Sequence, residues 1–205
     1  MLTKPNILRL VFFVAAFAAA LYYPVNRVLS FERPKEKPVE MRFPVRAYDP
    51  YDPMRGHYLQ LSFDTRLKLP KGECEWMAPR DGVRRRPQAL AVLETGPDGN
   101  ARVTGFAPLD APPAGKPFVR LPYYYAFKDK KDDGLHVSFR LPFDRYFINE
   151  KLAPDAEVLI GNITRGKKHS AVLVVNVYAD GRHAVKDLLV DGRPLLTHLR
   201  PAAAK

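Results

Sequence analysis

Two aspartates, an arginine and a histidine gather in one short polar segment, DPYDPMRGH, at residues 49–57. Asp49, Asp52 and His57 are of the types that serve as general acids and bases, and Arg55 could hold an anion. The spacing of the aspartates lacks the glycine of a calcium loop, and no second histidine pair completes a zinc site. One interpretation is therefore a catalytic or ligand-binding corner that needs no metal and no cofactor.

The same segment has the composition of a turn that leads into a strand. Aspartate before proline starts turns through side-chain-to-backbone hydrogen bonds, and Gly56 lets the chain reverse. The next residues, YLQLSF, alternate in character, so Leu59, Leu61 and Phe63 are expected in the core. Tyr58 then faces the opposite way. We favour this structural interpretation, in which the corner sets how a strand enters its sheet.

Other residue types that carry chemistry lack the partners that a site requires. Cys74 lies between two glutamates, whose negative charge raises the pKa of a thiol and weakens it as a nucleophile. The five histidines show no metal-ligand spacing, and residues 161–168 lack the Gly-Lys-Ser/Thr of a phosphate loop. The sequence thus predicts no catalytic residue, no metal ligand and no cofactor.

Composition points to a strand-rich domain with a basic surface. Among 205 residues, the 20 prolines and 12 glycines suit short strands joined by turns. The formal net charge of +11 favours contact with anionic partners such as phospholipid head groups or nucleic acid. A net charge of this size indicates which partners the protein could attract, and it does not indicate the fold.

An uncharged apolar run, LVFFVAAFAAALYYPV, fills residues 10–25. As a helix it would be about 24 Å long, slightly short of a hydrocarbon core of about 30 Å. Possible small-residue cleavage sites lie inside the run rather than after it, so we expect an uncleaved signal anchor over residues 1–30. Tyr22 and Tyr23 are placed where amphipathic rings favour the membrane interface.

The orientation of this anchor has two opposing indications. Lysines and arginines are more numerous after the apolar run than before it, which favours a cytoplasmic C-terminal side. A short N-terminal tail followed by a long folded domain is typical of exported single-span proteins, because long domains translocate largely regardless of charge. We expect a single-pass protein of a bacterial inner membrane with its domain outside the cytoplasm. Such a domain would not meet nucleic acid.

The remaining chain predicts a spacer and one β-rich domain. Residues 31–40, rich in charge and proline, suit a semi-extended spacer, and residues 41–200 form the domain. No long segment after residue 30 shows a helical period, so we expect an all-β or mostly β fold, barrel-like or sandwich-like. The segments with strand signals are 41–48, 57–67, 89–95, 101–109, 118–127, 134–143, 145–152, 157–164, 170–180 and 182–192.

Two weak internal similarities suggest that the domain has two similar halves. The segment that begins at His57 is similar to the one that begins at His136. Asp98-Gly99 and Asp180-Gly181 are each followed by a strand, and they are separated by nearly the same length of chain as the two histidines. Because strand–turn–strand elements recur in any β protein, a duplicated module is a hypothesis that the strand order must test.

Three short segments stand out in order along the chain: RGHYLQLSF at 55–63, YFINEK at 146–151, and ADGR with VDG at 179–182 and 190–192. Together they resemble the GDYXXLXY family of small bacterial membrane-anchored proteins. The residues that carry this resemblance are Arg55, Gly56, His57, Tyr58, Leu61, Phe63, Tyr146, Phe147, Glu150, Asp180, Gly181, Asp191 and Gly192.

The chain departs from the family pattern at positions that matter for chemistry. The aspartate after the glycine is His57 here, and the final tyrosine is Phe63. A motif that acted through that carboxylate and hydroxyl would have lost its chemistry, whereas a structural motif accommodates both changes. The resemblance implies an accessory subunit that binds a multi-pass membrane protein, because members are encoded near such proteins. The anchor, the charged spacer and the lack of a catalytic constellation favour a non-enzymatic role. An envelope enzyme or ligand-binding protein that uses the Asp49–His57 corner is the alternative.

Overall fold

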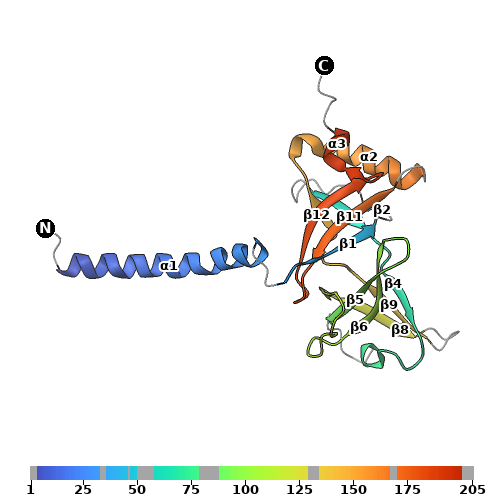
Figure 1. Ribbon diagram of the computed structural model, residues 1–205, viewed down its shortest axis with the longest axis horizontal. Coiled ribbons are helices and arrows are strands. Elements are labelled where there is room, and N and C mark those ends of the chain that lie inside the picture. The colour runs from blue at the N-terminus through green and yellow to red at the C-terminus, as the bar shows by residue number, and fades with distance from the viewer. Residues whose placement is uncertain are drawn as a thin grey trace, which may run out of the picture. The chain divides into compact units, whose positions relative to one another are not determined.

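The computed structural model describes residues 4–32, 36–45, 47–49, 58–78, 88–128, 134–166 and 170–199. The chain divides into two compact units, Met1–Pro38 and Val39–Lys205. Each unit is described by itself below (Figure 1).

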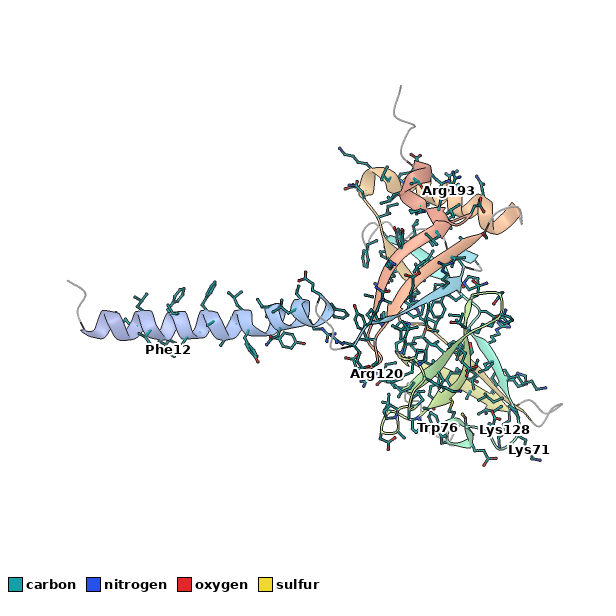
Figure 2. All side chains as sticks on the ribbon, in the orientation of Figure 1. Phe12, Lys71, Trp76, Arg120, Lys128 and Arg193 are labelled. Carbon is teal, nitrogen blue, oxygen red and sulfur yellow. The ribbon has the colours of Figure 1, made fainter. Side chains whose placement is uncertain are left out.

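The first unit is one long helix, α1 (Lys4–Glu32), and it confirms the helix expected over residues 10–25. Its segment Arg9–Leu29 has 21 residues with a mean hydropathy of 1.4, and none of it is buried, so it is long and apolar enough to cross a membrane. Its apolar side chains are exposed to solvent, as Phe12 is at 77% exposure (Figure 2). A signal sequence would have the same length and composition.

The second unit is rich in strands, with α2 and α3 lying next to β11 and β12 (Figure 1). Its helices are η1 (Glu75–Met77), η2 (Glu150–Leu152), α2 (Ala153–Gly166) and α3 (Leu195–Leu199), where η marks a 3-10 helix. Its strands are β1 (Val39–Pro44), β2 (Ala47–Asp49), β3 (Tyr58–Ser62), β4 (Arg66–Leu69), β5 (Ala89–Thr95), β6 (Ala101–Ala107), β7 (Phe118–Leu121), β8 (Tyr124–Lys128), β9 (Leu135–Phe139), β10 (Arg145–Phe147), β11 (Ala171–Val177), β12 (His183–Val190) and β13 (Arg193–Pro194).

The strands that the structure describes form small antiparallel sheets with the orders β1-β11-β12-β13, β10-β3-β2, β4-β9-β8 and β6-β5-β7. The prediction of a β-rich domain is therefore confirmed. Each of these sheets has two free edges, so the described strands do not close into the barrel that was one of the two expected forms.

The sheets are built by exchanging strands between two similar halves, β1–β6 and β7–β12. Strand β1 of the first half pairs with β11 of the second, and β7 of the second half pairs with β5 of the first. In the same way β4 pairs with β9, while β10 pairs with β3. Every exchange has a reciprocal counterpart, which is the arrangement that an internal two-fold relation produces.

Backbone hydrogen bonds repeat between the halves. The Leu61 N–H donates to the Asp144 carbonyl at 2.8 Å, and the Phe139 N–H donates to the Thr65 carbonyl at 3.0 Å. Leu61 and Phe139 are thus equivalent positions, and His136 is equivalent to Tyr58. The sequence comparison instead aligned His136 with His57, so the predicted alignment was wrong by a single position at this strand.

The two long hairpins correspond as the sequence predicted, with Asp98-Gly99 equivalent to Asp180-Gly181. A β-bulge follows Val92 in the β5–β6 hairpin and Val174 in the β11–β12 hairpin. In both turns the aspartate accepts the N–H of the residue two positions later. The agreement of bulge, register and turn confirms that the domain consists of two similar halves.

The core lies where the alternating pattern predicted it. Leu59 and Leu61 are 0% and 3% exposed, and Phe63 is 8% exposed. The Phe63 ring packs against Phe43 and Phe143, with centroids 6.3 Å and 5.9 Å apart. Strand β3 is therefore held by its apolar face, and its other face, with Tyr58, Gln60 and Ser62, is half-buried or exposed.

The predicted strand over 157–164 was wrong, because this segment lies in helix α2. Its consecutive apolar residues fit a buried strand as well as a helix, and sequence alone does not distinguish the two. In the structure Ala156 and Ile160 are fully buried, whereas Val158 is 64% exposed. Burial at i and i+4 with exposure between them is the helical period.

Several long predicted strands are divided into two elements. Pro122 separates β7 from β8 within 118–127, because proline has no N–H to donate to a ladder. The predicted strand 145–152 ends after β10 and continues as a 3-10 helix. The Asn149 side chain caps that helix by accepting the Lys151 N–H at 3.0 Å.

Candidate functional site

The polar corner that opens the motif lies largely outside the described residues. Asp52, Arg55, Gly56 and His57 are among the residues not described, and Asp49 is described only as the last backbone position of β2. Their role in a turn or in chemistry stays a prediction.

The first and second motif segments lie on neighbouring strands. In the β3–β10 pair, Tyr58 is opposite Phe147 and Leu59 is opposite Tyr146. The Tyr58 and Phe147 ring centroids are 6.0 Å apart, and the Arg145 guanidinium carbon lies 4.9 Å from the centre of the Tyr58 ring. We call Tyr58, Arg145 and Phe147 the Tyr58 cluster. Phe147 is 75% exposed, so the cluster presents an aromatic surface to solvent.

Tyr146 points to the opposite face of β10 and joins the second motif segment to β12. Its hydroxyl donates to Asp187 Oδ1 at 3.3 Å, and the same oxygen accepts the Leu188 N–H at 2.7 Å. Burial and the neighbouring Asp187 carboxylate raise the pKa of Tyr146 to about 12. Tyr146 therefore stays protonated at neutral pH, and it positions Asp187 rather than transferring a proton.

The raised pKa of Tyr146 predicts a loss of stability in alkaline solution. Because the folded state binds this proton more tightly, the contribution is complete below pH 10 and is lost as the pH rises to about 12. Tyr146→Phe should remove this part of the decline in melting temperature. It should also remove the tyrosinate absorbance that develops near pH 12. If the tyrosinate absorbance that disappears in Tyr146→Phe is instead one that develops near pH 10, Tyr146 does not lie beside Asp187 as the structure shows.

The third motif segment forms turns. Gly181 has φ +79° in the β11–β12 turn, where Asp180 Oδ2 accepts from Arg182 Nε at 2.6 Å. Asp191 and Gly192, with φ of 49° and 78°, make the two-residue connection between β12 and β13. Two consecutive positive φ angles are the requirement of a type I′ hairpin, so these residues are explained by the backbone.

The motif residue that remains to be placed is Glu150, which begins η2 directly after the Asn149 cap. The motif residues that the structure describes therefore divide into a solvent-facing pair, Tyr58 and Phe147 of the Tyr58 cluster, and a part that lies in the core or fixes turns and strand register.

A hollow of about 710 Å³ borders the cluster between β10 and β12, with Arg145, Phe147, His183 and Lys186 among its lining residues. The His183 ring packs against Phe143 at 5.5 Å, and burial lowers its pKa, so it is neutral at pH 7. Lys186 Nζ donates to a Glu40 carboxylate oxygen at 2.5 Å, which lowers the pKa of Glu40. Sequence reasoning did not single out Arg145, Asp187 or His183; the adjacency of Arg145 to the Tyr146-Phe147 motif was the available signal.

Among the described residues, no group of three or more His, Cys, Asp or Glu side chains could hold a metal ion. The arrangement around the Tyr58 cluster is suited to recognition: it has one exposed ring, Phe147, a half-buried ring, Tyr58, with a guanidinium over it, and a neighbouring hollow.

Comparison with known proteins supports the motif assignment over most of the chain. No curated protein and no solved structure matches this sequence. The family described as GDYXXLXY protein matches residues 21–188, from the second half of α1 to β12. The match includes the segments that meet at the Tyr58 cluster, and the chain belongs to the GDYXXLXY family.

Proposed function

We propose that the protein is a membrane-anchored, non-enzymatic accessory subunit whose β domain binds an integral membrane partner through the Tyr58 cluster. The observation that carries this proposal is the 75% exposure of Phe147, whose ring packs against Tyr58, which in turn packs against Arg145. Aromatic residues and arginine are enriched among the side chains that dominate the binding energy of protein interfaces. Aromatic rings in particular bury a large area with few rotatable bonds. A solvent-facing cluster of this composition is suited to a protein partner.

The anchor limits where that partner can be. Residues 33–38 join α1 to β1, and the seven backbone steps from Glu32 to Val39 can span at most about 24 Å. If α1 lies in a bilayer, the start of the domain stays near the membrane surface. Proteins embedded in the same membrane are then present at a high effective concentration, which favours them as partners.

We place the anchor in a bacterial inner membrane and the β domain outside the cytoplasm, because long folded domains follow such N-terminal segments across the membrane. Alkaline phosphatase fused after Lys205 should then be active. An inactive fusion, with an active cytoplasmic reporter in its place, would reverse the orientation.

Phe147→Ala should greatly reduce copurification of the partner, because it removes the most exposed ring of the Tyr58 cluster. The full-length chain would be affinity-purified from detergent-solubilised membranes, and the copurifying proteins would be compared between variants. Truncation of an aromatic at the centre of an interface costs about 2 kcal/mol or more, roughly a thirtyfold loss of affinity.

The matched control is Tyr125→Ala, which removes another exposed ring, 67% accessible, from strand β8. It should leave copurification unchanged. Wild-type protein that elutes only as a free monomer, or equal losses in the two variants, would contradict the proposal.

A further inference from the structure

A second hollow, of about 490 Å³, lies where equivalent strands of the two halves meet. Most of its lining residues come from β3 and β9 and from the residues that follow them, so equivalent positions line it from both sides; Tyr123 and Tyr125 complete the lining. By the relation that makes Leu61 equivalent to Phe139, Gln60 corresponds to Ser138 and Ser62 corresponds to Arg140. We call this hollow the central groove. Its volume is within the range of small-molecule sites.

The central groove contains an ion pair that only one half has. Arg140 Nε donates to Asp144 Oδ2 at 2.5 Å, and Arg140 Nη2 contacts the same oxygen. In the first half the corresponding positions are Ser62 and Thr65, and the same backbone bonds form there without charges. The fold therefore does not require this pair. A partly buried ion pair is also weak evidence of a contribution to stability, since desolvation offsets its attraction.

The ion pair is organised to present hydrogen-bonding groups. Tyr123 bonds to Arg140, and the Asp144 side chain is only 16% exposed, so both charged groups are held in place. Gln60, Ser62 and Ser138 contribute an amide and two hydroxyls to the same wall. The groove thus offers fixed donors and acceptors close together.

Two exposed aromatic rings of β8 lie at the edge of the central groove. Tyr125 lines it and is 67% exposed, and Phe127, two positions along β8, is 40% exposed, with the ring centroids 5.9 Å apart. An exposed ring next to donors and acceptors matches a ligand with one apolar face and a hydroxylated edge.

These observations identify a ligand class. The charged side chains that line the central groove, Arg140 and Asp144, neutralise each other, so the groove has no excess charge to attract an anion. A neutral polyol needs both donors and acceptors, and the C–H face of a sugar ring packs on aromatic rings. We propose that the central groove binds a short neutral oligosaccharide, with Tyr125 as its platform and the Arg140–Asp144 pair bonding its hydroxyls.

Isothermal titration calorimetry of the full-length protein tests this proposal, in a detergent without a sugar head group. The probes are chitotriose and maltotriose. Saturable, weak binding of at least one of them is expected. Tyr125→Ala should weaken it about fivefold to tenfold, the size of one aromatic contact. Tyr125→Phe should retain binding because it keeps the ring.

Phe147→Ala is the control, because it removes an exposed ring outside the central groove. Phe147→Ala should leave sugar binding unchanged and reduce partner copurification. Tyr125→Ala should weaken sugar binding and leave partner copurification unchanged. Failure of one proposal can therefore be distinguished from failure of the other. Absence of saturable binding of both sugars would overturn the inference. So would equal losses in Tyr125→Ala and Phe147→Ala. Binding of phosphatidylglycerol vesicles that depends on Tyr125, without sugar binding, would overturn it in favour of an anionic lipid site.

Discussion

Gly181→Ala is expected to lower the free energy of unfolding by about 2–5 kcal/mol, the sum of two effects. Gly181 has φ +79°, where any Cβ introduces backbone strain. A Cβ there would also lie 2.5 Å from Cε2 of the buried Phe118 ring, so the ring or the turn would have to move. Chemical denaturation monitored by circular dichroism would measure the loss.

The two similar halves provide a matched control at Gly99. This residue occupies the equivalent turn with φ +76°, but no atom lies within 4 Å of its Cβ position. Gly99→Ala should therefore lose only the backbone term, about 1–2 kcal/mol. Equal losses in the two variants would show that Phe118 does not pack against Gly181 as described.

Leu61→Ala should lower the free energy of unfolding by about 2–5 kcal/mol, the usual effect of removing a buried leucine side chain and leaving a cavity. Leu61 is 3% exposed, and its N–H is bonded to the Asp144 carbonyl, so β3 has little freedom to collapse around the change. Thermal and chemical denaturation of the purified variant would measure this.

Val158→Ala is the comparison for that variant, because Val158 is 64% exposed on α2 and alanine has a high helix propensity. It should change stability by no more than about 0.5 kcal/mol. A loss in Leu61→Ala as small as that in Val158→Ala would contradict the core position of Leu61. If Leu61→Ala kept the stability of the wild type but lost partner binding, the motif would have a direct role in function.

The sequence determined the features that depend on local periodicity. The β5 strand begins and ends where the strand signal over residues 89–95 predicted, and Leu59, Leu61 and Phe63 are buried as the alternation in their own segment predicted. Side chains alternate across any strand, so their pattern reports the buried face without knowledge of the partner strand. The apolar span of α1 and the Asp180-Gly181 turn were also predictable, because apolar length and turn residues are local signals too.

Tertiary packing decided the conformation of α2. Val158 and Ile160 belong to one apolar run, and nothing local distinguishes a buried strand from a helix in such a run. Packing selected the helix, in which Ile160 is buried and Val158 faces solvent.

Only the tertiary structure determined which strands are neighbours. The backbone donors of β3 could pair with any strand, since hydrogen bonds of a ladder carry little information about the partner sequence. The exchange of strands between halves placed Phe147 opposite Tyr58 and brought Asp144 to the carboxyl end of β3. Both the Tyr58 cluster and the central groove consist of residues far apart in the chain, and they exist because the folded path of the backbone brings those residues together.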